Sequence, residues 1–292
     1  MRAWQPRTLR STTPPSATSN APLVAEPLRR ISEGREAEIF AYGDGAVLRL
    51  LRNPNAQQQI VWEAAAMRAA ASAGVRVPAV IEVTTVDGRP GLVMERIDGL
   101  DMLAAIARRP WLVFAAGAAA GRIQAGLNGV VAPADLPPMR AVMRQRIQQE
   151  TAIPDDLKSF ALSVLDTLPD GDKICHGDLH PGNIMQTAAE PVIIDWTNVT
   201  RGDPTADYVR SLLTLRISDV PPGQPWVIRH GATVARGLLI SAYTRAYRRI
   251  LPLNEEHIRR WEVAVAAVRI GDGIEPETPK LIALLERARS EA

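Results

Sequence analysis

The sequence is short of cysteine and of long apolar runs, and both shortages exclude classes of protein. Cys175 is the single cysteine, so the chain can form neither an internal disulfide nor a thiolate cluster for a structural metal. This usage is typical of a reducing compartment, and we expect a cytoplasmic protein. The longest run of apolar residues and glycine, 111–121, is well below the ~18 to 20 residues that cross a bilayer, so no membrane partner is expected.

Lysine is also scarce, and net charge is small. The chain has 34 basic and 32 acidic residues, and the resulting charge of +2 provides no overall basic field that would attract nucleic acid. Only Lys158, Lys173 and Lys280 are lysines, so a cationic site before residue 158 must use arginine.

Length and composition favour a folded chain of about two domains or lobes, at roughly 150 residues each. Apolar residues make up 46% of the 292 and charged residues 23%, which excludes a mainly disordered protein. Residues 1–27 contain arginines followed by Ser, Thr, Pro and Ala without an apolar run. We expect a flexible tail there, not a secretory signal.

Residues 28–97 predict a small antiparallel sheet with one helix. The helix is indicated by apolar spacing and by Gly74, which would end it. The predicted order is strands at 28–31, 39–42 and 46–51, a helix at 55–73, and strands at 77–84 and 91–97, with turns at 43–45 and 87–91. Arg49 on the third strand and Glu63 on the helix could meet, and a cation held in this way suits a nucleotide phosphate. Taken alone, they are equally consistent with a solvated arginine and a surface glutamate.

Residues 98–292 predict a larger, mainly helical part. Helices are expected at 102–108, 111–127, 139–150 and 155–168, with further helices after residue 224.

The most informative segment is the polar loop HGDLHPGN at 176–183, followed by VIIDW at 192–196. If the flanking strands pair as a hairpin, Asp178, Asn183 and Asp195 come into one neighbourhood. Phosphoryl transfer needs a carboxylate that orients and deprotonates the attacking hydroxyl, and oxygen ligands that hold Mg²⁺ on nucleotide phosphates. We therefore predict Asp178 as the base and Asn183 and Asp195 as the metal ligands.

The same loop permits a second interpretation. His176, Asp178 and His180 could ligate the metal of a hydrolase, but a catalytic zinc site needs a further ligand. Only His230 and His257 remain, both far along the chain in helical context.

HGDLHPGN together with VIIDW resembles the aminoglycoside phosphotransferase and choline kinase group, small-molecule kinases with the protein-kinase fold. The resemblance extends from about residue 28 onward. It implies an α+β, two-lobed protein-kinase-like fold, with a nucleotide-binding lobe at 28–97 and a catalytic and substrate-binding lobe at 98–292. It further implies ATP or GTP and Mg²⁺ as cofactors, and a small-molecule hydroxyl as acceptor.

The resemblance also implies roles for individual residues. Gly34, in SEGREAE at 32–38, would belong to the loop that covers the phosphates, although this copy is poor in glycine. Arg49 takes the place of the strand-three lysine or arginine, and Glu63 is its partner acid. In VMERIDG at 93–99, the Glu95 carbonyl and the Ile97 amide would meet the adenine edge.

Structural roles are implied for three further residues. His176 would pin the catalytic loop, and Asp207, in a GDP-x-x-D segment, would help to hold it. Asp203 is also expected to cap a helix that begins at Pro204.

The acceptor stays open at this level. The region after residue 224 mixes aromatic and acidic side chains, namely Trp226, Tyr243, Tyr247, Trp261, Glu255, Glu256, Glu262 and Asp272. Acids there would suit an aminoglycoside or other amino sugar, and an aromatic cage would suit choline. Homoserine, a macrolide or another small alcohol would also fit the reaction. A nucleotide-binding pseudoenzyme without turnover is the alternative, but the presence of all three groups of the polar loop favours an active kinase. The oligomeric state is undetermined.

Overall fold

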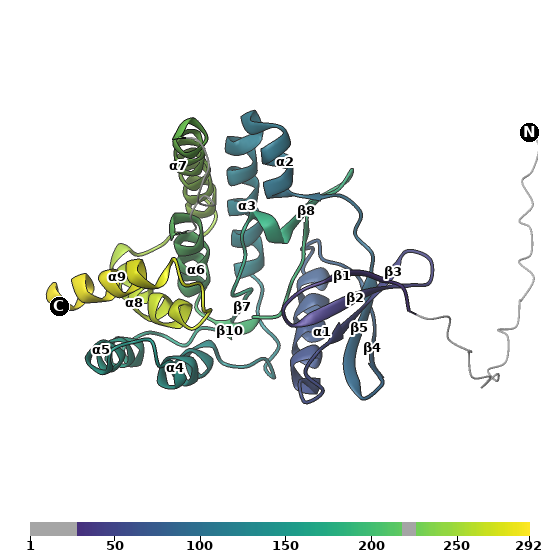
Figure 1. Cartoon of the computed structure of the whole chain (residues 1–292), viewed down its shortest axis with the longest axis horizontal. Coiled ribbons are helices and arrows are strands. Elements are labelled where there is room, and N and C mark those ends of the chain that lie inside the picture. Colours follow the sequence, from purple (N-terminus) through teal and green to yellow (C-terminus); the bar gives the residue numbers. More distant parts are fainter. Residues whose placement is uncertain (1–27, 218–225) are drawn as a thin grey trace, which may run out of the picture.

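The computed structural model describes residues 28–217 and 226–292, so the tail expected at 1–27 lies outside the described residues. The first part is a five-stranded antiparallel sheet in the order β1-β2-β3-β5-β4, with helix α1 beside it (Figure 1). Its elements are β1 (Arg30–Glu33), β2 (Ala37–Tyr42), β3 (Ala46–Leu51), α1 (Gln57–Ser72), β4 (Val80–Val86) and β5 (Arg89–Glu95). The expected order is confirmed, with ends that shift by a few residues.

The largest shift is at the last hairpin. A turn was expected over residues 87–91, but Asp87 and Gly88 alone make it, with φ values of 51° and 75°. A two-residue turn with both residues at positive φ matches the twist of paired strands, so Arg89 already belongs to β5.

Helix α1 packs one face against the sheet. Ile60, Ala64 and Met67 lie on that face and are buried by apolar contact. Glu63 lies on the same face and is only 1% exposed. A buried carboxylate requires a partner, and the site provides one.

The remaining part is mainly helical, as expected. Its helices are α2 (Met102–Arg108), α3 (Val113–Asn128), α4 (Met139–Gln149), α5 (Asp155–Asp166), α6 (Pro204–Ile217), α7 (Trp226–Arg248), α8 (Glu255–Ile270) and α9 (Thr278–Ser290). The single helix expected at 111–127 begins instead as a 3₁₀ turn at Pro110–Leu112. Helix α6 begins at Pro204, and Asp203 accepts the Thr205 amide at 2.7 Å, which confirms the expected cap.

Helices α3 and α7 run side by side at unusually close range (Figure 1). A Cβ added at Gly117 would come within 2.4 Å of the Leu239 carbonyl oxygen, and one at Gly121 within 2.3 Å of that of Tyr243. Only glycine permits this approach, which brings Tyr243 and Tyr247 of α7 into hydrogen-bond contact with Gln124 and Asn128 of α3.

The strands around the catalytic loop pair differently from the expected hairpin. Strand β7 (Lys173–Cys175) pairs with β10 (Thr200–Gly202), while β8 (Ile184–Gln186) lies between β6 (Leu100–Asp101) and β9 (Val192–Ile193). The two strands that flank the loop therefore belong to different sheets. The β8–β9 hairpin still brings the end of β9 back to the loop.

Candidate active site

A cavity of about 780 Å³ lies between the sheet and the helical part. Its walls include the β1–β2 turn, the inner face of the sheet, the segment after β5, and both stretches of the polar sequence around Asp178 and Asp195. Such a volume is sufficient for a small-molecule ligand or cofactor.

Asp178 and Asp195 line this cavity, and Asn183 is hydrogen-bonded to Asp178. Asn183 donates from Nδ2 to the Asp178 carbonyl oxygen at 2.9 Å, and the Ile194 amide donates to the Asn183 carbonyl oxygen at 3.0 Å. These two bonds tie the loop to the residue that precedes Asp195. The Asp178 side chain is 28% exposed, so its carboxylate is accessible.

Asn183 and Asp195 offer oxygen atoms that fit a magnesium ion. Because Asn183 uses Nδ2 as a donor, its Oδ1 is left free to act as a ligand. Asp195 accepts the Thr197 hydroxyl on Oδ1 at 2.7 Å, which leaves Oδ2 available. Asp195 also has a φ of 62°, a conformation that non-glycine residues rarely adopt, often at functional sites. An amide oxygen and a carboxylate suffice for Mg²⁺, which keeps water and phosphate oxygens as its other ligands.

The histidines of the loop have other tasks. His176 is fully buried, donates from Nε2 to the Ile194 carbonyl oxygen at 3.0 Å, and accepts the Asp178 amide on Nδ1 at 3.3 Å. Both ring nitrogens are thus engaged, which confirms that His176 pins the loop. His180 likewise accepts the Gly182 amide on Nδ1 at 3.0 Å.

This arrangement disfavours the metallohydrolase interpretation. His176 has no nitrogen to give to a metal, and His180 already uses Nδ1 to accept the Gly182 amide. Within the two described ranges, no three His, Cys, Asp or Glu side chains are grouped so that they could hold a metal ion.

Asp207 fixes the polar loop at Gly177, as expected. Its Oδ1 accepts the Gly177 amide at 2.7 Å, and its Oδ2 accepts Gln124 Nε2 at 3.0 Å and Asn128 Nδ2 at 2.9 Å. Gln124 and Asn128 belong to α3, which therefore fixes the residue immediately before Asp178.

Arg49 and Glu63 form the predicted contact, and the structure extends it. Arg49 Nη1 donates to Glu63 Oε2 at 2.7 Å, and Nη2 donates to Thr197 Oγ1, also at 2.7 Å. Since Thr197 in turn bonds Asp195, one chain of hydrogen bonds joins the arginine to the metal-ligand candidate. Burial raises the pKa of Glu63, and the neighbouring Arg49 opposes that rise.

The other predicted nucleotide residues also line the cavity. Gly34 lies in the β1–β2 turn, where its amide donates to the Ala37 carbonyl oxygen at 2.8 Å; an added Cβ would find ample space. The Glu95 carboxylate is held by Arg76, whose hydrogen bonds lower the pKa of Glu95. Among the described residues, the Ile97 amide has no hydrogen-bond acceptor, so it is free to meet a ligand.

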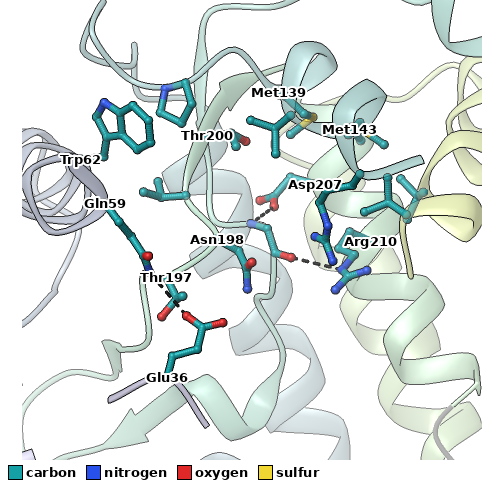
Figure 2. A pocket seen from close by; sticks show the side chains of 18 residues that line it. Glu36, Gln59, Trp62, Met139, Met143, Thr197, Asn198, Thr200, Asp207 and Arg210 are labelled. Atoms are coloured by element: carbon teal, nitrogen blue, oxygen red, sulfur yellow. Dashed lines mark hydrogen bonds between the residues drawn. The ribbon is translucent and has the colours of Figure 1, made fainter. Parts of the chain in front are cut away.

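Sequence reasoning missed Thr197 and a second cavity. Thr197 lies two residues after Asp195, which is the signal that could have identified it. The second cavity, of about 470 Å³, adjoins the first at Glu36, Thr197 and Asn198 (Figure 2). Its other walls come from α1, α4, α6 and α8, so no local pattern could have revealed it.

The aromatic cage considered for choline is not formed by the residues expected for it. Tyr243, Tyr247 and Trp261 are core side chains with at most 2% exposure, and the side chain of Trp226 lies outside the described residues. The expected acidic surface is also largely paired: Glu255 contacts Arg248, and Glu262 contacts Arg216.

The described residues form no helix that is both long and apolar enough to span a membrane. No curated protein matches the chain.

Solved structures similar to this chain are kinases of small molecules. Amicoumacin kinase hAmiN, in complex with AMP-PNP, Ca²⁺ and Ami, has 16% identity and a TM-score of 0.61, with 91% of this chain and 88% of that chain covered. A thermostable mutant of aminoglycoside phosphotransferase APH(4)-Ia, in ternary complex with AMP-PNP and hygromycin B, has 15% identity and a TM-score of 0.63, covering 91% and 94%. A putative fructosamine-3-kinase from Haemophilus somnus 129PT has 13% identity and a TM-score of 0.60, covering 90% and 91%. These likenesses confirm the kinase-like fold.

A comparison of the sequence with models of protein families agrees with the structural comparison. The model of the phosphotransferase enzyme family matches residues 27–253, a range that contains the whole cleft and its polar loop. The chain belongs to the phosphotransferase enzyme family.

Proposed function

We propose that the protein transfers the terminal phosphate of ATP or GTP to a hydroxyl of a small molecule, with Mg²⁺ as cofactor. The observation that carries the proposal is that Asp178 and Asp195 line the same cleft as the buried Arg49–Glu63 pair. Asn183 is bonded to Asp178, and Thr197 joins Arg49 to Asp195. The nucleotides bound in amicoumacin kinase and APH(4)-Ia support the choice of cofactor.

Each residue has a distinct task in this proposal. Asp178 orients the acceptor hydroxyl and takes its proton as the oxygen attacks the terminal phosphorus in line. Arg49, held by Glu63, donates to phosphate oxygens and stabilises the charge that spreads over them. Asn183 and Asp195 would hold Mg²⁺, which when bound neutralises negative charge on the phosphates.

The remaining contacts of the nucleotide follow from the walls of the cleft. Residues 28–97 would form the nucleotide-binding lobe, with Gly34 in the turn that covers the phosphates. The Glu95 carbonyl and the Ile97 amide would meet the base, and residues 98–292 would supply the catalytic loop and the acceptor site.

The acceptor is a small hydroxylated molecule. Hygromycin B and amicoumacin are bound by the similar structures, and amino sugars are therefore one candidate class. Choline, homoserine and macrolides are further candidates, to be separated by a screen with labelled nucleotide.

The decisive experiment measures nucleotide binding and turnover separately. For Asp178→Ala we expect retained binding of AMP-PNP with Mg²⁺ in calorimetry, and a loss of about a hundredfold or more in phosphate transfer or ATP hydrolysis. For Asp195→Ala we expect loss of the Mg²⁺-dependent part of nucleotide binding. Asp44→Asn, in the exposed β2–β3 turn, is the matched control and should change neither.

Two results would contradict the proposal. Unchanged turnover in Asp178→Ala would remove that residue from the mechanism. Nucleotide binding without any turnover, over the whole acceptor screen, would instead favour a pseudoenzyme.

A further inference from the structure

The second cavity lies next to the proposed reaction centre. Gly177, immediately before Asp178, forms part of its wall, and Thr197 and Asn198 separate it from the nucleotide cleft. A molecule in this cavity would therefore lie beside the residue that precedes Asp178. Its volume of about 470 Å³ is in the range of small-molecule sites.

Most of the cavity wall is apolar. Figure 2 shows the indole of Trp62 on one side and Met139 and Met143 on another. Val265 and Val268 of α8 complete this surface. An occupant with an apolar body would gain from burial here, at about 25 cal/mol for each Å² removed from water.

The polar end of the cavity is built from arginine. Arg146 of α4 and Arg210 of α6 both reach Asp272, with Arg146 Nη2 at 2.6 Å from Oδ1 and Arg210 Nη2 at 2.5 Å from Oδ2. Nearby, Arg269 is bound on two sides by Glu277, at 2.7 and 3.0 Å. Three guanidinium groups thus share the carboxylates of Asp272 and Glu277 at this end.

These arginines still have donors to offer. Arg210 is 8% exposed, and its Nη1 is buried with no hydrogen-bond partner among the described residues. A buried charged donor without a partner is costly, and its positive charge favours an anion in the cavity that Arg210 lines. The side chain of Arg146 is 34% exposed and, among the described residues, donates to Asp272 through Nη2 alone. Its Nε and Nη1 atoms can therefore donate to a ligand.

The carboxylates that line the cavity do not suit a polycation. Asp207 already accepts three hydrogen bonds, from Gly177, Gln124 and Asn128. The Glu36 carboxylate, at the junction with the nucleotide cleft, accepts from Gln59 Nε2 at 3.4 Å and from no other described residue. One available acid cannot balance the several ammonium groups of an amino sugar.

We propose that this cavity binds the acceptor, and that the acceptor is a mainly apolar hydroxy acid whose carboxylate faces Arg146 and Arg210. This inference rests on the proposed function, because it assigns the second substrate of the same reaction. It separates this chain from the aminoglycoside phosphotransferases whose fold it shares.

The test compares ligands that differ in charge. Arg210 Nε donates to the Gly177 carbonyl oxygen at 3.2 Å, so the carboxylate and the reacting hydroxyl must lie close together in the acceptor. Medium-chain 3-hydroxy fatty acids, their methyl esters and kanamycin are therefore titrated calorimetrically into the full chain with Mg²⁺ and AMP-PNP. Because a hydrogen bond to a charged group contributes ~1.5–3 kcal/mol, we expect the acids to bind about tenfold or more tightly than their esters. Kanamycin should neither bind in this cavity nor displace the acids.

Variants assign the preference to the arginine end. Arg146→Gln should abolish the difference between acid and ester, and Arg146→Lys should keep most of it. The matched control is Arg144→Gln, on the same helix but paired with Asp166 outside the cavity.

Each contrary result overturns the inference. These are kanamycin binding more tightly than every acid, equal affinity of acids and esters, no binding of any acid, or an unchanged acid preference in Arg146→Gln. If nucleotide binding and its dependence on Asp195 persist in that case, the phosphotransfer proposal stands and only the acceptor class is wrong. Loss of both would count against the proposed function itself.

Discussion

Replacing Arg49 by lysine tests whether the arginine is more than a positive charge. Its guanidinium binds Glu63 with one nitrogen and Thr197 with the other, each at 2.7 Å. Lysine keeps the charge that Glu63 needs, but its single ammonium cannot reproduce the two-nitrogen fork. The bond to Thr197 is the one we expect to be lost.

The magnitude follows from that single bond. A hydrogen bond from a charged donor contributes ~1.5–3 kcal/mol, which corresponds to roughly a ten- to 150-fold change in an equilibrium or rate constant. We expect Arg49→Lys to weaken binding of AMP-PNP with Mg²⁺ and to lower kcat/KM for ATP within this range. The loss should be smaller without Mg²⁺, because Thr197 also orients Asp195.

Arg89→Lys is the matched control. Arg89 lies in the same sheet, donates to Glu38 at 2.7 Å and to the Leu51 carbonyl oxygen at 2.8 Å, and does not line the nucleotide cavity. The variant should bind nucleotide as the natural protein does. Equal nucleotide affinity and turnover in Arg49→Lys and the natural protein would refute the reasoning, because the fork would then have no effect.

Removing the charge has a different signature, visible in the pH dependence of stability. Arg49→Met leaves Glu63 buried without its cation, a loss of ~3–5 kcal/mol at neutral pH. Burial already raises the pKa of Glu63 above its ordinary value, and without Arg49 the pKa should rise further. A raised folded-state pKa favours the fold at pH below the ordinary value and penalises it as pH rises through the folded value. The destabilisation in chemical unfolding should therefore shrink toward pH 4.

Three further predictions concern the scaffold. Gly121→Ala should force α3 and α7 apart and destabilise the fold by ~1–3 kcal/mol, read as a lower Tm, whereas Gly126→Ala, on the same helix with open space at its Cβ, should be neutral or slightly stabilising. Asp207→Asn should place a side-chain NH₂ group against the Gly177 amide or Gln124 Nε2, which are themselves donors. The loop before Asp178 should then move, and both stability and kcat should decrease; an unchanged kcat would contradict this. The Arg76 hydrogen bonds lower the pKa of Glu95, so they should stabilise the fold above about pH 4.5 and lose this effect as the pH falls and Glu95 is protonated. In Glu95→Gln, the Tm should therefore decrease less between neutral and acidic pH than it does in the natural protein.

The local parts of the fold could be predicted from the sequence, and the long-range parts could not. Hydrophobic spacing and turn residues gave the order of strands around the helix at 55–73, since both signals act over a few residues. The Arg49–Thr197 bond joins residues 148 positions apart and has no local signature. The same holds for the pairing of β7 with β10, which replaced the expected hairpin across the catalytic loop.

A second limit of the sequence is that it does not show which neighbours a helical side chain faces. Helical periodicity identifies aromatic and acidic residues after residue 224 but does not reveal what they face. Tyr243 and Tyr247 are core side chains, and Asp272 forms ion pairs with Arg146 of α4 and Arg210 of α6. The acceptor class was therefore undecidable until the helices had been placed in space.

The tyrosines explain how the loop before Asp178 is held in place without a ligand. Tyr247 donates to Asn128 Oδ1 at 2.9 Å, and Tyr243 donates to Gln124 Oε1. Burial raises the pKa of both hydroxyls, so they keep their protons and act as donors at neutral pH.

Each amide is thereby oriented with its oxygen toward a tyrosine and its nitrogen toward Asp207. The buried carboxylate receives donors from two side chains and keeps its remaining oxygen for the Gly177 amide, which lies immediately before Asp178. Because the cost of aligning these groups is met during folding, the position of Asp178 does not depend on substrate contacts. In the proposed reaction, where Asp178 is the base, this preorganisation lowers the reorganisation required when the acceptor arrives.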